Sequence, residues 1–208
     1  MTDITDCFFE NTSYEIKIRK FIILNVSQVN MSERWDEWDV LDPSVSIDGV
    51  DCYRCEHQPL NRAYYSHKLN HAGLRYLIAL SMGSGRKKIV WWGGGVPCGS
   101  NPDLTLAREI FVQLLEPRER ALADLGFQDP RFFKTRIARP QTDWDTEFNR
   151  QHKTEMACHE TINKRIKQFG ILRDFRHAED SKHKLAFGAI IQITQLCLED
   201  QPLFKSNV

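Results

Sequence analysis

Met156–His177, with the sequence MACHETINKRIKQFGILRDFRH, is the stretch that best shows how this chain is organised. Its apolar residues recur at intervals of three and four, which predicts a helix with one buried stripe: Ile162, Ile166, Phe169 and Leu172. Polar residues at i, i+3, i+4 and i+7 share a different face: Glu160, Asn163, Lys164 and Lys167. That face can hold a metal ion beside an anionic strand, or it is a solvated face with a Glu–Lys pair.

The composition is typical of a globular domain. The chain has 208 residues, of which 41% are hydrophobic and 27% charged, enough for one domain with a substantial core. The formal net charge is zero, so no overall basicity indicates a nucleic-acid partner. The segment from Lys164 to Arg176, however, contains five cationic residues and a single acid, Asp174. Such a local basic face can bind phosphate on a neutral protein.

Several classes of protein are excluded by the sequence. No apolar run approaches the length of a membrane span, and the N-terminus lacks the order of a signal peptide. Six cysteines in a chain this long predict reduced thiols rather than a disulfide framework. Cys52 and Cys55, with His57 nearby, have the spacing of half a zinc site, but the isolation of the other cysteines favours buried or spectator thiols. The triple glycine at 93–95 lacks the context of a phosphate loop.

The first half of the chain predicts strands. Phe21–Leu24 is a short apolar run that periodicity cannot assign, and residues 32–40 resemble a short helix or turn. A strand starts at Val45 and carries Asp48 near its middle. Two further strands are predicted to pair antiparallel across a turn at 83–86, the second ending at the triple glycine: Leu74–Met82 and Lys88–Trp92.

The second half predicts mostly helices. Asn101-Pro102-Asp103 has the features of a helix start, and Pro117 those of a stop. A short strand over Arg120–Phe127 contains Asp124. The remaining predictions are a strand over Thr135–Pro140, a polar loop to about Lys153, the Glu160 helix and a last helix from about Ser181. This order predicts a mixed α/β layer fold.

Three acids lie at comparable places in these elements: Asp48 on a strand, Asp124 at the end of a later strand, and Glu160 on a helix. Mg²⁺ takes hard oxygen ligands and retains waters, so a few carboxylates suffice to hold it. Two such ions can activate an attacking water and stabilise the leaving oxygen in phosphoryl transfer. A metal-dependent nuclease needs such a set of acids, although each acid alone is better explained as a turn or edge-strand residue.

Five segments stand in order along the chain: SIDGVDC around Asp48, YYSHKLNHAGLRYLIALS, IVWWGGGVPCGSNPDLTLAR, ALADLGF around Asp124, and CHETINKRIKQFGILRDFRH around Glu160. Together they resemble the catalytic domain of DDE-type transposases, specifically the PIF/Harbinger-like superfamily and its host-derived nucleases. The second and third acids are 160 − 124 = 36 positions apart, leaving 35 residues between them, the D-35-E spacing of many DDE enzymes. The resemblance covers residues 46–198, between an N-terminal segment (1–45) of unclear structure and a C-terminal tail (199–208).

The resemblance implies an α/β fold of the RNase H-like kind, a mixed sheet flanked by helices, that cleaves DNA phosphodiester bonds with Mg²⁺ or Mn²⁺. By the same resemblance, Asp48, Asp124 and Glu160 match the catalytic, metal-binding acids. Asp103 matches a further acid in the family's G-x-x-D segment and so a fourth metal ligand. An acid in the first turn of a helix, however, also complements the helix dipole without any metal.

His67 and Lys68 match the family's Ser-His-Lys segment, which implies that they contact DNA phosphates or orient the site; an ordinary polar loop is the alternative. Lys164, Arg165 and Lys167 are expected to face DNA. The family often works with a separate Myb-like DNA-binding protein in the nucleus, so the resemblance implies DNA and such a protein as partners. It implies a nuclear location, with the cytoplasm as an additional one, allows a homo-oligomer and gives no membrane role.

The sequence also departs from the family pattern. Leu125 follows the second acid, where relatives commonly carry a small or basic residue. Cys158 stands where relatives often have arginine, and no helical DNA-binding region is recognisable in residues 1–45. These departures leave open an alternative, a catalytically inactive, transposase-derived DNA-binding or regulatory protein.

Overall fold

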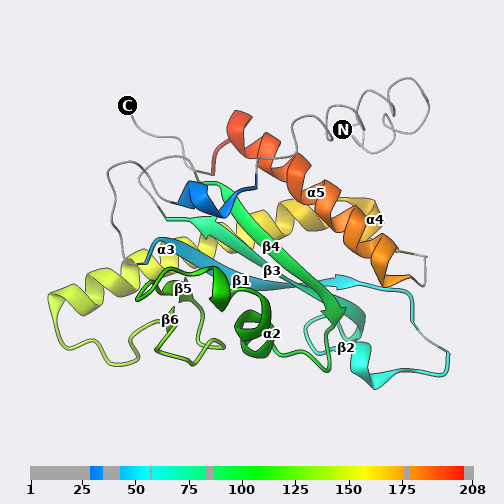
Figure 1. The fold of residues 1–208 in the computed structure, drawn as a ribbon, viewed down its shortest axis with the longest axis horizontal. Coiled ribbons are helices and arrows are strands. Elements are labelled where there is room, and N and C mark those ends of the chain that lie inside the picture. Colours follow the sequence, from blue (N-terminus) through cyan, green and yellow to red (C-terminus); the bar gives the residue numbers. More distant parts are fainter. Residues whose placement is uncertain (1–28, 35–42, 57, 83–86, 176–178, 204–208) are drawn as a thin grey trace.

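A computed structural model describes residues 29–34, 43–56, 58–82, 87–175 and 179–203 (Figure 1). The apolar run Phe21–Leu24, the predicted turn at 83–86 and most of the predicted helix or turn at 32–40 lie outside the described residues. The start of that last segment falls in a 3₁₀ helix, η1 (Met31–Arg34).

A mixed sheet of six strands forms the centre of the fold. Its members are β1 (Val45–Tyr53), β2 (Tyr65–Ser66), β3 (His71–Ser81), β4 (Ile89–Pro97), β5 (Ala121–Ala123) and β6 (Phe133–Lys134). Strand β3 pairs antiparallel with β1, β2 and β4, whereas β5 pairs parallel with β1, and β6 parallel with β5. The main order across the sheet is therefore β4-β3-β1-β5-β6, with β2 attached at the start of β3.

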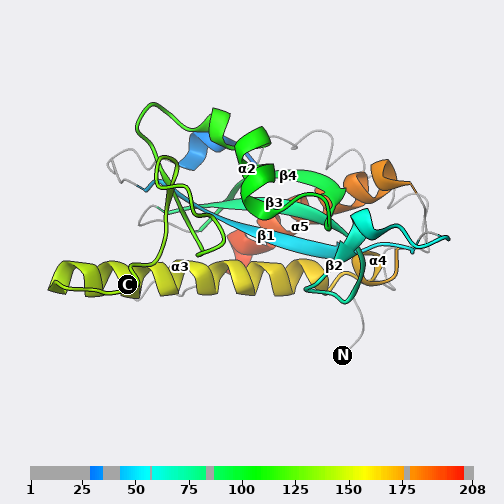
Figure 2. The same cartoon turned by 90° about the horizontal axis from the view of Figure 1, so that it is seen from below.

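Helices cover both faces of this sheet, as Figure 2 shows for α2 and α3. They are α2 (Asp103–Ile110), α3 (Asp143–Lys167), α4 (Gly170–Arg173) and α5 (Asp180–Asp200), with 3₁₀ helices η2 (Arg62–Tyr64) and η3 (Val112–Leu114). One core lies between the sheet and α3, α4 and α5; the other lies under α2 and η3. In the described part of the chain, no helix is both long and apolar enough to cross a membrane.

Strands β1 and β3 have almost continuous apolar sequences because both of their faces are buried. Along β1, Val50 and Cys52 enter the core beneath α3, while Val45 and Ile47 enter the core beneath α2. This alternation confirms the predicted strand from Val45 with an acid near its middle. The helix predicted from about Ser181 is confirmed as α5.

The predicted polar loop up to Lys153 is wrong, because α3 begins at Asp143. Thr142 and Asp145 form a reciprocal capping box at this start, with hydrogen bonds of 3.1 and 3.0 Å. The stripe predicted on Met156–His177 is divided, since α3 ends at Lys167 and the short α4 begins at Gly170. Ile162 and Ile166 are fully buried on α3, and Leu172 is buried on α4.

Three strand predictions also need correction. The strand predicted over Arg120–Phe127 is shorter, because β5 spans only Ala121–Ala123. No strand covers Thr135–Pro140; the chain pairs only at Phe133–Lys134 and is then irregular. The triple glycine does not end its strand, because β4 continues through it to Pro97. Gly94 adopts φ +107°, and a Cβ there would lie 2.6 Å from the Arg75 carbonyl oxygen, so the strand needs glycine at this bulge.

Two buried histidines fix α3 to the sheet. His152 Nε2 lies 2.8 Å from the Ala123 carbonyl oxygen at the end of β5, and His159 Nε2 lies 3.0 Å from Ser46 Oγ on β1. Burial lowers the pKa of His159 to about 3, so this imidazole is neutral in the folded protein.

This burial predicts acid sensitivity. Unfolded His159 takes up a proton near its ordinary pKa of 6.5, so its stabilising contribution is complete above pH 6.5 and is lost as the pH falls towards 3. We expect the free energy of unfolding, measured with urea, to fall between pH 7 and 5 by up to ~1.4 kcal/mol per pH unit from this residue.

His159→Gln should reduce that slope, whereas replacement of the exposed His67 should not. Burial also lowers the pKa of His183, so a smaller slope of the same sign should remain in the His159 variant. An unchanged slope in His159→Gln would contradict the assignment.

Candidate functional site

Asp48 and Asp124 lie side by side on neighbouring parallel strands. The pairs Ser46–Leu122 and Ile47–Ala123 are in register, and each aspartate is the next residue along its chain. Asp48 projects towards α3, where it contacts Asn163, whereas Asp124 is the first residue after the end of β5 and lies close enough to Asp48 to raise its pKa. The structure thus brings together two of the predicted acids that are 124 − 48 = 76 positions apart.

The electrostatic surroundings of Asp48 disfavour its charge. Burial raises the pKa of Asp48, and the nearby carboxylates of Asp124 and Asp103 raise it further. The Gly49 backbone N–H and the Lys68 ammonium act in the opposite direction but do not cancel the shift. A cation bound here would relieve this repulsion.

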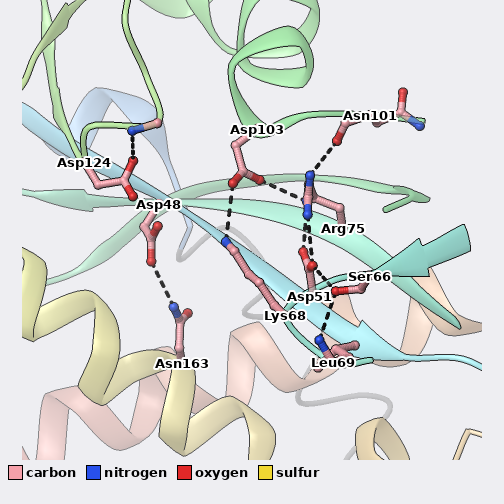
Figure 3. A network of polar contacts seen from close by, with 11 residues as sticks. Asp48, Asp51, Ser66, Lys68, Leu69, Arg75, Asn101, Asp103, Asp124 and Asn163 are labelled. Atoms are coloured by element: carbon pink, nitrogen blue, oxygen red, sulfur yellow. Dashed lines mark hydrogen bonds and ion pairs between the residues drawn. The ribbon is translucent and has the colours of Figure 1, made fainter. Parts of the chain in front are cut away.

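Asn163 on α3 contacts Asp48 from below the sheet (Figure 3). Its Nδ2 donates to Asp48 Oδ2 at 3.2 Å, while its Oδ1 is shielded from solvent and accepts no hydrogen bond. A buried acceptor without a partner is costly, and buried polar atoms of this kind are often explained by an ion or water. Asn163 therefore adds an oxygen donor to the aspartate pair.

Glu160, the third predicted acid, is exposed. It precedes Asn163 by three residues and so lies about 60° around the helix axis from it. Among the residues that the structure describes, no three His, Cys, Asp or Glu side chains are arranged to hold a metal ion. The structure brings Asp48 and Asp124 together and leaves Glu160 on the adjoining face of α3.

Asp103 lies on the other face of the sheet, at the first position of α2 and directly over Gly49. Its carboxylate makes ion pairs with Arg75 Nε at 3.0 Å and with Lys68 Nζ at 3.4 Å. A Cβ added to Gly49 would lie 2.4 Å from Asp103 Oδ1, so glycine is what allows this carboxylate to approach β1. The helix start was predicted, but Asn101 does not cap it: its side chain donates to the Pro97 carbonyl oxygen.

Sequence reasoning missed a buried network beside the predicted acids. Asp51, opposite Arg75 in the β1–β3 register, accepts two hydrogen bonds of 2.9 Å from its guanidinium. Ser66 Oγ donates to Asp51 at 2.6 Å (Figure 3). These hydrogen bonds outweigh burial and lower the pKa of Asp51. A lone arginine within the apolar sequence LRYLIAL was the available signal, because a charge in a buried strand needs a partner.

The predicted DNA-binding residues lie in different surroundings. Lys68 reaches the acids, and the carboxylates of Asp103, Asp51 and Asp48 overcome burial to raise its pKa. His67 is exposed and makes an edge-on contact with the Tyr65 ring.

On α3, Lys164 and Lys167 are exposed beside Glu160. Arg165 instead donates to the Gln201 carbonyl oxygen at 3.0 Å, so it faces the end of α5.

The cysteine pair does not form a common site in the described residues. Cys52 is buried in the core beneath α3, whereas Cys55 is exposed. Burial raises the pKa of Cys52 to about 12, which makes its thiolate inaccessible. His57 lies outside the described residues.

The donor set fits a hard divalent cation. Asp48 and Asp124 supply carboxylate oxygens, and Asn163 supplies an unpaired amide oxygen, all of the ligand type that Mg²⁺ and Mn²⁺ prefer. Asp103 is already neutralised by two cations and fits the predicted helix-terminal role better than that of a ligand.

Comparison of the chain with protein-family models, with curated proteins and with solved structures found no match.

Because Asp103 approaches Gly49 so closely, we expect the effects of substitutions at the two positions on the free energy of unfolding to be strongly coupled. Gly49→Ala should lower the free energy of unfolding, measured with urea, by roughly 1–3 kcal/mol, because the carboxylate cannot move without breaking its ion pairs. Gly170→Ala is the matched control, since an added Cβ there meets nothing within 4 Å.

In an Asp103→Ala background most of the cost of Gly49→Ala should disappear, because the atom that clashes is gone. Equal costs in the two backgrounds would show that the clash is not with Asp103.

Proposed function

We propose that the protein is a divalent-metal-dependent DNA endonuclease of the DDE type, with Asp48, Asp124 and Glu160 as its acids. The observation that carries this proposal is the pairing of Asp48 with Asp124 on neighbouring parallel strands, where the charge of Asp48 is disfavoured unless a cation is near. A structural role alone gives no reason to place two carboxylates together at this cost.

The sheet supports assignment to the RNase H-like fold. In the order β4-β3-β1-β5-β6, the first three strands along the sheet are antiparallel neighbours and the last two run parallel to β1. The acids then lie on the central strand, at the end of its parallel neighbour, and on the helix that covers both. This is the placement of the acids that the sequence pattern predicts, and it supports the resemblance to PIF/Harbinger-like transposases.

Each residue has a distinct part in this proposal. Asp48 and Asp124 would hold Mg²⁺ or Mn²⁺ with the Asn163 oxygen, and Glu160 would complete the site from α3. Bound metal supplies activation of the attacking water or 3′ hydroxyl and neutralises charge on the phosphate. Lys68 would help to bind the phosphate, and Lys164 and Lys167 would contact the DNA backbone.

A second candidate, a transposase-derived DNA-binding protein without catalysis, is favoured by the exposure of Glu160. The neutralisation of Asp103 by Lys68 and Arg75 also favours it, because these cations reduce the need for a metal ion. A Myb-like partner and a nuclear location remain predictions from the resemblance.

Nicking of supercoiled plasmid separates the two candidates. The wild-type protein should nick in Mg²⁺ and not in EDTA, while Asp48→Asn and Glu160→Gln should lose nicking and keep DNA binding, because an amide lacks the charge that holds the cation. Glu109→Gln, an exposed acid on α2, is the matched control and should nick normally.

The thermal stability of the same variants gives a second readout. Without metal, Asp48→Asn should melt a few degrees above the wild type because it removes a disfavoured charge, and Mg²⁺ should no longer raise its melting temperature. Absence of Mg²⁺-dependent nicking together with absence of Mg²⁺-dependent stabilisation would favour the non-catalytic candidate.

Lys164 and Lys167, the lysines beside Glu160, should affect DNA binding and not the cleavage step. Lys164→Ala and Lys167→Ala should each reduce the magnitude of the log–log salt slope of DNA binding by about one unit, through counterion release. Lys182→Ala on α5 is the control, because Lys182 is paired with Glu179 at 3.1 Å. Wild-type slopes in the first two variants would remove this face from the DNA interface.

A further inference from the structure

The N-terminal turns of α3 extend past the β5–β6 side of the sheet (Figures 1 and 2). Trp144 and Phe148 precede Ile162 and Ile166 by eighteen residues, or five helical turns, and so continue the same stripe. Ile162 and Ile166 are fully buried, whereas Trp144 is 66% exposed. Its ring is stacked on Phe148, with centroids 5.6 Å apart and planes 16° from parallel. The protein therefore presents an ordered aromatic pair to its surroundings.

A basic segment is held beside this part of the helix. Asn149 accepts from the Ile137 backbone N–H and donates to the Ile137 carbonyl oxygen, both at 2.9 Å. These two bonds fix the chain on which Arg136 and Arg139 lie. Both arginines are exposed, and in the described part of the chain neither has a carboxylate partner.

Lys153, one turn after Asn149, is a third exposed cation. Two of the three neighbouring acids already have hydrogen-bond or ion-pair partners on or next to α3. Asp145 closes the capping box, and Glu147 pairs with Arg150 at 2.6 Å. Asp143 remains exposed at the helix N-terminus. The surface around the aromatic pair is thus suited to an anionic partner.

This surface is close to the candidate metal site. His152, two turns after Trp144, contacts the Ala123 carbonyl oxygen, and Asp124 is the next residue along the chain. The eight residues from Trp144 to His152 span about 12 Å of helix, which is between three and four base steps of a DNA strand at about 3.4 Å each. The last pair between β5 and β6 is Leu122–Lys134, and Asp124 and Arg136 each follow it by two residues. One DNA strand could therefore contact both regions.

We propose that Trp144, Phe148, Arg136, Arg139 and Lys153 form a binding surface for an unpaired strand of the DNA substrate beside the acids. We call it the α3 extension surface. A base would stack on the exposed face of Trp144, and the cations would contact the phosphates that follow. Aromatic side chains combined with cations are the usual means of holding single-stranded nucleic acid, and arginine suits phosphate because of its planar fork. The inference rests on the proposed function and specifies which part of the substrate is held.

The test compares two fluorescein-labelled DNAs, a blunt duplex and the same duplex with a short 3′ single-stranded extension, by fluorescence anisotropy in EDTA. The wild type should prefer the extended duplex. Trp144→Ala should weaken binding of the extended duplex roughly 5- to 150-fold, the equivalent of ~1–3 kcal/mol for one stacked base. Binding of the blunt duplex should change little, and Trp144→Phe should restore most of the affinity.

Arg136 and Arg139 should contribute to DNA binding through their charge. Arg136→Ala and Arg139→Ala should each lower the magnitude of the salt slope for the extended duplex by about 0.7. Leu185→Ala, which removes a 75% exposed side chain on α5, and Lys182→Ala are the matched controls and should match the wild type. Thermal melting of every variant by circular dichroism checks that the fold is intact.

Equal affinity of Trp144→Ala and wild type for the extended duplex would overturn the inference. So would self-association of the wild type that Trp144→Ala abolishes while DNA binding is unchanged, since the surface would then join two copies of the chain. Failure of the nuclease proposal is distinguishable: plasmid nicking would be absent while the Trp144-dependent preference persisted. Normal nicking with no such preference would overturn this inference alone.

Discussion

The parallel pairing of β5 with β1 is the constraint on which the candidate site depends. Parallel neighbours cannot be joined by a tight turn, so a long connection is needed, and here it runs through η2, β2, β3, β4, α2 and η3. That path puts Asp124, the first residue after β5, beside Asp48 on β1. Any shift of β5 by one residue along β1 would turn its side chains to the opposite face and move Asp124 away from Asp48.

Charge around these aspartates is balanced unequally on the two faces of the sheet. On the α2 face, Arg75 is bonded to Asp51 and close to Asp103, so those carboxylates are neutralised within the protein. On the α3 face, Asp48 has a polar amide and a more distant lysine as its partners, and its charge remains disfavoured. The same strand therefore combines a stable ion-pair network with a carboxylate pair that would gain from an external cation.

Helix α3 connects these features. Its buried histidines hold the ends of β1 and β5 in place, its Asn163 contacts Asp48, and its first turns carry the exposed Trp144. These side-chain hydrogen bonds orient α3 more than they stabilise the fold, because a buried hydrogen bond adds only about 1 kcal/mol. If the proposed function is correct, one rigid element relates the metal site to the place where the substrate strand is held.

The sequence by itself determined the elements whose burial pattern is simple. Strands β1 and β3 are short apolar runs bounded by turn residues, α5 has a helical apolar stripe, and Asp48 stood out as a charge within such a run. The mixed α/β class followed from the order of these elements. The segment 141–153 was misassigned because most of its side chains are exposed, so its sequence carries little apolar periodicity; its helix is set by the Thr142 cap and the packing of His152.

Only the tertiary structure decided which charges meet. The Asp51–Arg75 bond depends on the β1–β3 register, and the approach of Asp103 to Gly49 depends on where α2 crosses the sheet. Likewise, the rotation of α3 turned Asn163 rather than Glu160 towards Asp48. Sequence periodicity reports which face of an element is apolar, but contacts between polar side chains depend on strand register and helix rotation, which are set by packing between residues far apart in the chain.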